Sequence, residues 1–254
     1  MTAPLQQEIH VWLARPEARS LPELTHSYQA LLSVEEQQRC QRFHFAHDRK
    51  HYLAAHALLR LCLGHYLACA PESVRLTPGL NGKPELAGQS VQTSLHCNLS
   101  HTRGMVACAV TGVGPCGIDV EGIRAMADMD GIAQTVYSAD EIAYLASQEE
   151  AARPLAFFTL WTLKEAYIKA TGLGMSAPLQ QISIDAEELS VRDASRLAQE
   201  PGEWLFDSWQ PGPDHALALA CNSARTVRTI VYHEMNLATA SLHILQQRDI
   251  APLA

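Results

Sequence analysis

The alternation of helical and strand-like segments is the feature of this sequence that most restricts its fold. Residues 33–70 carry apolar side chains at helical spacing, and residues 95–123 break into short apolar or alternating runs punctuated by glycine, which is typical of strands. A second helical stretch covers residues 138–171, with a break near Pro154. Helices followed by strands, twice over, predict an α+β fold. Further strand candidates are 181–185, 203–210, 215–222 and 228–235.

Local signals mark where some of these elements begin and end. Ser33 precedes the first helical stretch and Glu36 follows three residues later, a pattern that predicts a capping box. Asn81-Gly82 suits a tight turn with positive φ. The chain divides near residues 113–117 into what could be two related α+β halves.

Composition excludes several classes of protein. Of 254 residues, 47% are hydrophobic and 18% charged, which is enough for a core and argues against disorder. No apolar run is long enough for a membrane span, and no secretory signal is visible at the start. The seven cysteines are odd in number and scattered, as expected of reduced thiols in a cytoplasmic protein. A net charge of −8 argues against a general nucleic-acid binder.

The segment GIDVEG, residues 117–122, carries two carboxylates at strand spacing. Asp119 and Glu121 lie two residues apart and therefore share one face of a strand. Like charges on one face repel unless a cation lies between them, and Mg²⁺ prefers oxygen ligands of this kind. The alternative is an exposed edge strand with solvated acids.

The segment WTLKEAYIKATGLG, residues 161–174, places a carboxylate and two ammonium groups in a mostly apolar helix. Glu165 shares a helical face with Lys169, four residues later, and with Trp161. The helix could bring a third carboxylate and a lysine to the same cation. The alternative is an ordinary surface ion pair.

A cationic run stands out in this acidic chain. Residues 39–51, RCQRFHFAHDRKH, combine arginine, lysine and histidine and could recognise phosphate, or could form a solvated helix face. His47 and His51 lie four residues apart, but no acidic or thiol ligands accompany them, so zinc is not expected.

Two short segments could add phosphate donors. Lys83 lies beside the turn in NGKPEL, and NLSHT presents Asn98, Ser100 and His101 before a strand. Adjacent residues on a strand point to opposite sides, and no G-x-S-x-G segment exists, so Ser100 and His101 are not expected to form a hydrolase dyad.

Together these segments resemble the 4′-phosphopantetheinyl transferase superfamily, in its two-lobed, surfactin-synthetase-activating type. The resemblance rests on GKP (82–84), NLSHT (98–102), GIDVE (117–121), YSADE (137–141) and the 161–174 segment, in that order. It covers residues from about 33 to about 184.

The resemblance implies a fold and a reaction. The fold would be two similar α+β lobes related by a pseudo-twofold axis, with the active site in the cleft between them. Residues 1–116 would form the N-terminal lobe on the nucleotide side, and residues 117–254 the C-terminal lobe with the metal site and catalytic helix. The enzyme would move the 4′-phosphopantetheine group of coenzyme A to a serine of an apo acyl or peptidyl carrier protein, releasing 3′,5′-ADP. It would act as a monomer, without nucleic acid or membrane.

The resemblance also implies residue roles. Mg²⁺, or Mn²⁺, would be held by three carboxylates, and coenzyme A by cations of both lobes; Glu165, Lys169 and Asp119 would be catalytic. The implied metal ligands are Asp119, Glu121 and Glu165, and the implied coenzyme A contacts are Arg39, Arg42, Lys50, His51, Lys83, Ser100, His101, Lys164 and Lys169. Two surfaces beside the expected metal site are candidates for receiving the carrier: the segment after GIDVE, with Arg124, Met126, Met129 and Ile132, and the Lys164 end of the 161–171 helix. The alternative is that residues 122–136 are only a mobile loop.

Three positions depart from the family pattern. Glu36 and His51 stand where Lys or Arg is usual, and Met175 replaces a frequent leucine. Two rival functions share the same residues: a Mg²⁺-dependent hydrolase of coenzyme A or another nucleotide, and a non-catalytic relative that only binds carriers. The intact carboxylates argue against the second.

Overall fold

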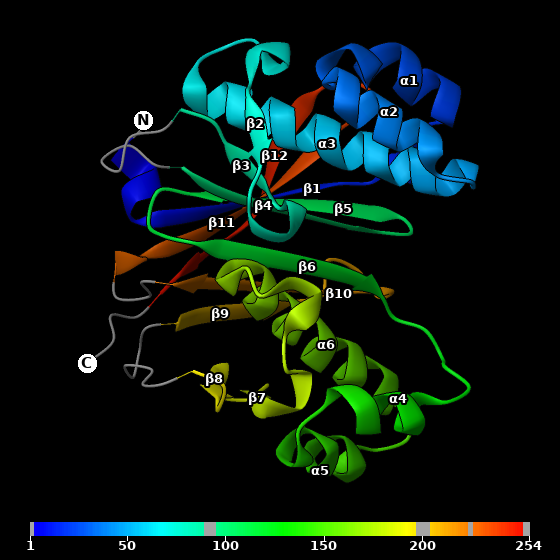
Figure 1. Ribbon diagram of the computed structural model, residues 1–254, viewed down its shortest axis with the longest axis vertical. Helices are drawn as coiled ribbons and strands as arrows, with labels where there is room; N and C mark the ends of the chain where they lie inside the picture. Colours follow the sequence, from blue (N-terminus) through cyan, green and yellow to red (C-terminus); the bar gives the residue numbers. More distant parts are fainter. Residues whose placement is uncertain (1–2, 89–94, 197–203, 223–225, 251–254) are drawn as a thin grey trace. The chain divides into compact units, whose positions relative to one another are not determined.

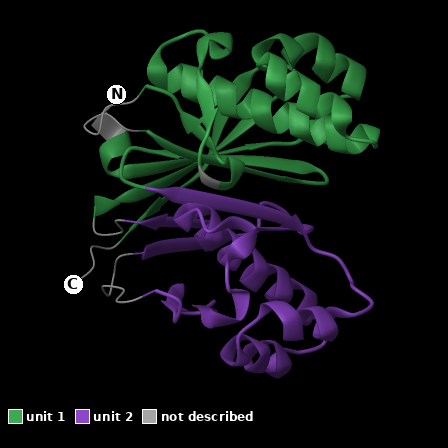
Figure 2. Ribbon diagram, in the orientation of Figure 1, with its two compact units in different colours: residues 1–114, 226–254 green, residues 115–225 purple. Residues whose placement is uncertain are grey.

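The computed structural model describes residues 3–88, 95–196, 204–222 and 226–250 (Figure 1). The chain divides into two compact units, one of residues 1–114 with 226–254 and one of residues 115–225 (Figure 2). The expected lobe boundary after residue 116 falls close to the first of these breaks. The assignment of 226–254 to the second lobe differs from the structure, because this segment adds strands to the sheet of the first unit.

The first unit is a five-stranded sheet covered by helices. Its strand order is β12-β11-β1-β5-β4, in which β1 runs parallel to β11 and antiparallel to β5. Figure 1 shows α1, α2 and α3 gathered on one side of this sheet. The elements are β1 (Glu8–Ala14), α1 (Leu21–Tyr28), α2 (Val34–Arg42), α3 (Ala46–Leu67), β2 (Leu76–Pro78), β3 (Pro84–Leu86), β4 (His96–Thr102), β5 (Met105–Thr111), β11 (Thr229–Asn236) and β12 (Ser241–Asp249).

The helix predicted over residues 33–70 is two helices. The predicted capping box is confirmed: the Ser33 hydroxyl accepts from the Glu36 N–H, and the Glu36 carboxylate accepts from the Ser33 N–H. Phe43 and Phe45 both have extended backbone angles, so α2 ends and α3 begins across this corner. The core of the unit forms where Leu58 and Leu63 of α3 meet the sheet.

The second unit is a three-stranded antiparallel sheet, in the order β6-β10-β9, packed against one long helix, α6. The predicted break near Pro154 is confirmed, since Pro154 lies in the first turn of α6, after α5 has ended. The elements are β6 (Cys116–Gly122), α4 (Met129–Val136), α5 (Ala139–Ser147), α6 (Arg153–Thr171), β7 (Ile182–Asp185), β8 (Ser190–Asp193), β9 (Trp204–Trp209) and β10 (His215–Asn222).

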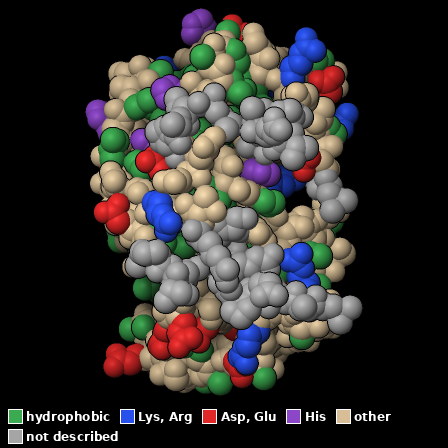
Figure 3. Space-filling model, turned by 90° about the vertical axis from the view of Figure 1, so that its left-hand side faces the viewer, with side chains coloured by type: hydrophobic (Ala, Val, Ile, Leu, Met, Phe, Trp, Pro, Cys, Tyr) green, Lys and Arg blue, Asp and Glu red, His purple; other side chains and the backbone are tan. Residues whose placement is uncertain are grey.

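The architecture confirms the predicted α+β class, and the predicted later strands correspond to β7, β9, β10 and β11. Glu203, at the start of one predicted strand, lies outside the described residues. The pseudo-twofold relation of the lobes stays a prediction. Among the described helices, none is long and apolar enough to span a membrane. On the face drawn in Figure 3, acidic and basic side chains are interspersed.

Candidate active site

The two carboxylates of β6 lie on the face that packs against α6. Asp119 is 4% exposed and Glu121 is half-buried, and both share their side of the strand with Gly117. The cross-strand neighbours of Gly117, Asp119 and Glu121 on β10 are Ala220, Ala218 and Ala216. Because these neighbours are small, α6 can lie close to this part of the sheet.

Gly117 makes the closest approach possible. A Cβ atom at this position would lie 2.0 Å from the Ala166 carbonyl oxygen and 2.6 Å from the Ala170 nitrogen. Any side chain here would therefore collide with the backbone of α6. The first residue of the GIDVEG segment sets the distance between the strand and the helix that carry the candidate catalytic groups.

Lys169 of α6 contacts the strand directly. Its Nζ donates to Asp119 Oδ1 at 2.6 Å and to the Ile118 carbonyl at 3.1 Å. The Asp119 side chain is 6% exposed and that of Lys169 is 27% exposed. A charge-assisted bond of this length, partly shielded from water, fixes the ammonium group over the acidic face of β6.

Glu165 lies within electrostatic reach of the same groups. Burial raises the pKa of the Glu165 carboxyl above its usual range, the negative charges of Asp119 and Glu121 raise this pKa too, and Lys169 lowers it in part. The structure therefore brings together three carboxylates and one lysine from β6 and α6, which sequence spacing alone could only suggest.

The donor set fits a hard divalent cation, because carboxylate oxygens are the ligands that Mg²⁺ prefers. Across the described ranges, however, no three His, Cys, Asp or Glu side chains are already close enough to enclose a metal ion. The Lys169 ammonium supplies the positive charge next to Asp119 in this structure.

Lys164 has a different role from the one the resemblance implies. Its side chain is 1% exposed, and Nζ donates to Glu141 Oε2 at 2.7 Å, the Leu179 carbonyl at 2.9 Å and the Val136 carbonyl at 3.0 Å. These three acceptors use all the donors of the ammonium group. The expected phosphate contact of Lys164 is therefore corrected: it ties α6 to its neighbours inside the second unit.

Two expected phosphate ligands of the first unit share one carboxylate. Glu17 accepts from Lys50 Nζ at 2.7 Å and lies 2.9 Å from His51 Nε2. His51 is only 3% exposed, and its Nε2 lies 3.3 Å from the Gly104 nitrogen. His51 thus connects α3 to Glu17 and to the turn at Gly104 within the first unit. This geometry gives no support to its expected contact with coenzyme A.

Glu36, the other departure from the family pattern, belongs to a half-buried ionic cluster. Besides capping α2, it lies 2.9 Å from His56 Nδ1 and 2.8 Å from Arg60 Nη2, and Arg60 also donates to the Val74 carbonyl. Burial raises the pKa of Glu36, but hydrogen bonds from His56 and from the Ser33 backbone, together with the charges of His56 and Arg60, hold this pKa below its usual range. These contacts within the first unit explain why an acidic residue stands at position 36. Arg39 and Arg42, on the same helix, are exposed.

The turn and strand donors lie where the sequence predicts them. Asn81 and Gly82 have φ of 55° and 78°, and Lys83 follows them directly before β3. On β4 the side chain of Ser100 is buried, whereas that of His101 is exposed. The two side chains point to opposite sides of the strand, so a Ser–His dyad is absent at this position.

Arg124, which the sequence suggests as a carrier contact, also lies beside the candidate active site. Its guanidinium group lies 4.9 Å from the centre of the Phe158 ring, 3.7 Å from Glu121 Oε2 and 3.0 Å from the Gly122 carbonyl. A cation held over a ring and beside Glu121 restrains that carboxylate. No local sequence signal could reveal this contact, since Phe158 lies on another element.

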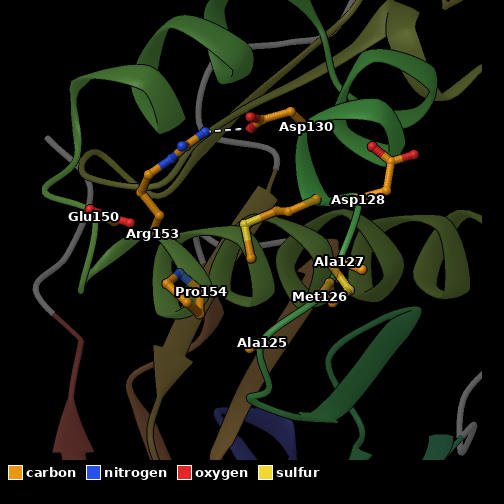
Figure 4. A pocket seen from close by; sticks show the side chains of 9 residues that line it. Ala125, Met126, Ala127, Asp128, Asp130, Glu150, Arg153 and Pro154 are labelled. Carbon is orange, nitrogen blue, oxygen red and sulfur yellow. Dashed lines mark hydrogen bonds and ion pairs between the residues drawn. The ribbon is translucent and has the colours of Figure 1, made fainter.

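A hollow with a volume of about 270 Å³ follows Arg124 along the chain (Figure 4). The ion pair between Arg153 and Asp130 bridges it, and Asp128 caps α4 through the Gly131 N–H. The lining residues are Ala125, Met126, Ala127, Asp128, Met129, Asp130, Glu150, Arg153 and Pro154. The expected carrier-facing methionines thus line a recess of the second unit.

The geometry defines a class: an α+β enzyme whose acidic strand and lysine-bearing helix suit transfer of a phosphate-linked group. Comparison with known proteins agrees. The family described as 4′-phosphopantetheinyl transferase superfamily matches residues 115–220, and that described as 4′-phosphopantetheinyl transferase, N-terminal, matches residues 19–112.

Individual relatives carry the same description. The 4′-phosphopantetheinyl transferase HetI of Nostoc sp. is 36% identical over 206 residues, which is 80% of this chain and 83% of that protein. The enzyme gsp of Aneurinibacillus migulanus is 32% identical over 170 residues, 67% of this chain and 68% of that one. Sfp of Bacillus subtilis is 26% identical over 174 residues, 68% and 74% of the two chains. The chain belongs to the 4′-phosphopantetheinyl transferase superfamily.

Proposed function

We propose that this transferase moves the 4′-phosphopantetheine group of coenzyme A to a serine hydroxyl of an apo acyl or peptidyl carrier protein and releases 3′,5′-ADP. The observation that carries the proposal is the meeting of Asp119, Glu121, Glu165 and Lys169 between β6 and α6. The reaction breaks a pyrophosphate bond, so negative charge develops on the departing phosphate, and positive groups in that position stabilise it.

Asp119, Glu121 and Glu165 would hold Mg²⁺, with Mn²⁺ as an alternative. When bound, the ion would neutralise charge on the pyrophosphate. Lys169 would then exchange its bond with Asp119 for a bond with the leaving phosphate. The Glu165 carboxylate would accept the proton of the carrier serine, directly or through one water.

The first unit would bind the nucleotide. Arg39, Arg42, Lys83 and His101 are cationic or polar groups on its surface or at half-buried positions, and Ser100 lies beside His101 on β4. Lys50 contributes less to this proposal, because Glu17 already neutralises it at 2.7 Å. The recess lined by Met126 and Met129 would receive the carrier. We place the enzyme in the cytoplasm and expect it to act as a monomer, without nucleic acid or membrane.

One experiment tests the reaction. The protein is incubated with an apo carrier protein, coenzyme A and Mg²⁺, and the carrier is weighed by mass spectrometry. A gain of one phosphopantetheine per carrier supports the proposal. Release of 3′,5′-ADP without any carrier would instead favour the hydrolase, and carrier binding without a mass change would favour the non-catalytic relative.

A further inference from the structure

Helix α2 is attached to the first unit without burying any side chain. None of its nine residues is buried, although the neighbouring helices α1 and α3 both contribute side chains to the core of the unit. On α2, Gln37, Cys40 and Gln41 lie on one side of the helix, because they are three and four residues apart. None of these side chains is a large apolar group, so this side of α2 does not fill the space toward α1 and α3.

A hollow of about 220 Å³ lies in this space, and we call it the α2 hollow. Leu21 of α1, Leu53 of α3 and Leu32, which lies between α1 and α2, form its apolar wall. Leu32 and Leu53 are buried, at 5% and 3% exposure. Sites for small molecules are typically recesses of this kind, mostly apolar with a few polar groups. The volume is below the range for drug-sized ligands and suits one ring with a small substituent.

Two polar side chains held in fixed orientations also line the α2 hollow. Gln37 Nε2 donates to the carbonyls of Gln29 and Leu32, both at 3.0 Å. The amide hydrogens are therefore used, and no described group donates to Gln37 Oε1, which can accept from a ligand. Arg49 Nη1 donates to the Phe43 carbonyl at 3.1 Å, and no described residue forms an ion pair with this guanidinium group. Its other N–H groups can donate to a ligand.

The combination fits one chemical class of ligand. The leucine wall suits a flat ring, Gln37 Oε1 requires a donor, and the Arg49 guanidinium group requires an acceptor. A carboxamide supplies both a donor and an acceptor, whereas a carboxylate has no donor for Gln37 and a hydrocarbon has neither. We infer that the α2 hollow binds a small aromatic carboxamide, which packs α2 against α1 and α3. This site is separate from the proposed transfer reaction and needs neither coenzyme A nor a metal.

The first test measures binding of benzamide to the full chain by isothermal titration calorimetry. A dissociation constant of about 1 mM or below is expected for a ligand of this size. Benzoate and toluene should bind about 5- to 10-fold more weakly, because each leaves at least one polar group without a partner. Arg49→Met should weaken benzamide binding about 10-fold and leave toluene binding unchanged. Equal binding of benzamide and toluene, or of benzamide by Arg49→Met and wild type, would overturn the inference.

The second test fills the α2 hollow. Cys40→Leu should abolish benzamide binding and raise the melting temperature by about 2–4 °C, as cavity filling does. Cys69→Leu is the matched control, since Cys69 is an exposed cysteine that does not line the hollow, and it should bind benzamide like wild type. Should Cys40→Leu lower the melting temperature, the comparison with Arg49→Met decides. Benzamide binding retained by a folded Cys40→Leu protein, no binding to wild type at about 10 mM, or displacement of benzamide by coenzyme A would each overturn the inference.

Discussion

Replacing Gly117 with alanine should separate the two halves of the catalytic site. The new Cβ would lie 2.0 Å from the Ala166 carbonyl oxygen, where ordinary contact begins at 3.4 Å. The shortfall is therefore about 1.4 Å, and the atoms in contact are backbone on both sides, so no side chain can turn away. Helix α6 must move away from β6 by roughly 1 Å, and Glu165 and Lys169 move with it. A displacement of this size costs about 100-fold in turnover.

The assay compares kcat and stability in the same preparations. Gly117→Ala should lower kcat for carrier modification about 100-fold and lower the free energy of unfolding by about 1–3 kcal/mol, as overpacking does. Gly112→Ala is the control, since its Cβ would lie 2.9 Å from the Leu5 carbonyl oxygen in the first unit. It should lose stability but keep kcat. A folded Gly117→Ala protein with kcat within about threefold of wild type would refute the argument, because that is far below the loss expected from displacement.

Four other outcomes are expected. EDTA should abolish carrier modification and Mg²⁺ should restore it, and Asp119→Ala should lower kcat on the order of 100-fold; full activity in EDTA would contradict this. His101→Ala should raise KM for coenzyme A far more than for its dephospho form, whereas equal changes would make His101 structural. Lys164→Met should lower the free energy of unfolding by about 3–5 kcal/mol in chemical denaturation, because Glu141 would keep a buried charge without its cation; a near-neutral effect would exclude the buried pair. Burial, and then the neighbouring His10 and His65, holds the pKa of His233 at about 4, below its ordinary 6.5. The unfolded chain therefore binds the proton first, and the free energy of unfolding should fall as pH drops from 6.5 to 4; His233→Gln should flatten this slope.

The sequence predicted best what local spacing controls. Strand alternation placed Asp119 and Glu121 on one face, and the Ser33 capping pattern marked the start of α2. Helical spacing places the two lysines of α6 on different faces, because they lie five residues apart, but it could not tell what each one contacts. Their roles depend on partners far along the chain, Glu141 for Lys164 and Asp119 for Lys169.

Long-range pairing also explains the error in the lobe boundary. Strand β1 was not predicted, and its parallel partner β11 lies more than 200 residues later. A parallel pair has no connecting turn to announce it in the sequence. Glu36 is a similar case. From the sequence it is an acidic residue in a segment expected to bind phosphate, and only the structure shows that it pairs with His56 and Arg60.

The return of residues 226–254 to the first sheet has a consequence for synthesis of the chain. Strand β1 leaves the ribosome early, but its neighbour β11 (Thr229–Asn236) emerges only after all of residues 115–225. The contiguous second unit can therefore fold during translation, whereas the first must wait with an unpaired strand edge. Until β11 arrives, that edge is open to pairing with other chains. The order of folding is thus the reverse of the order in which the two units begin to emerge.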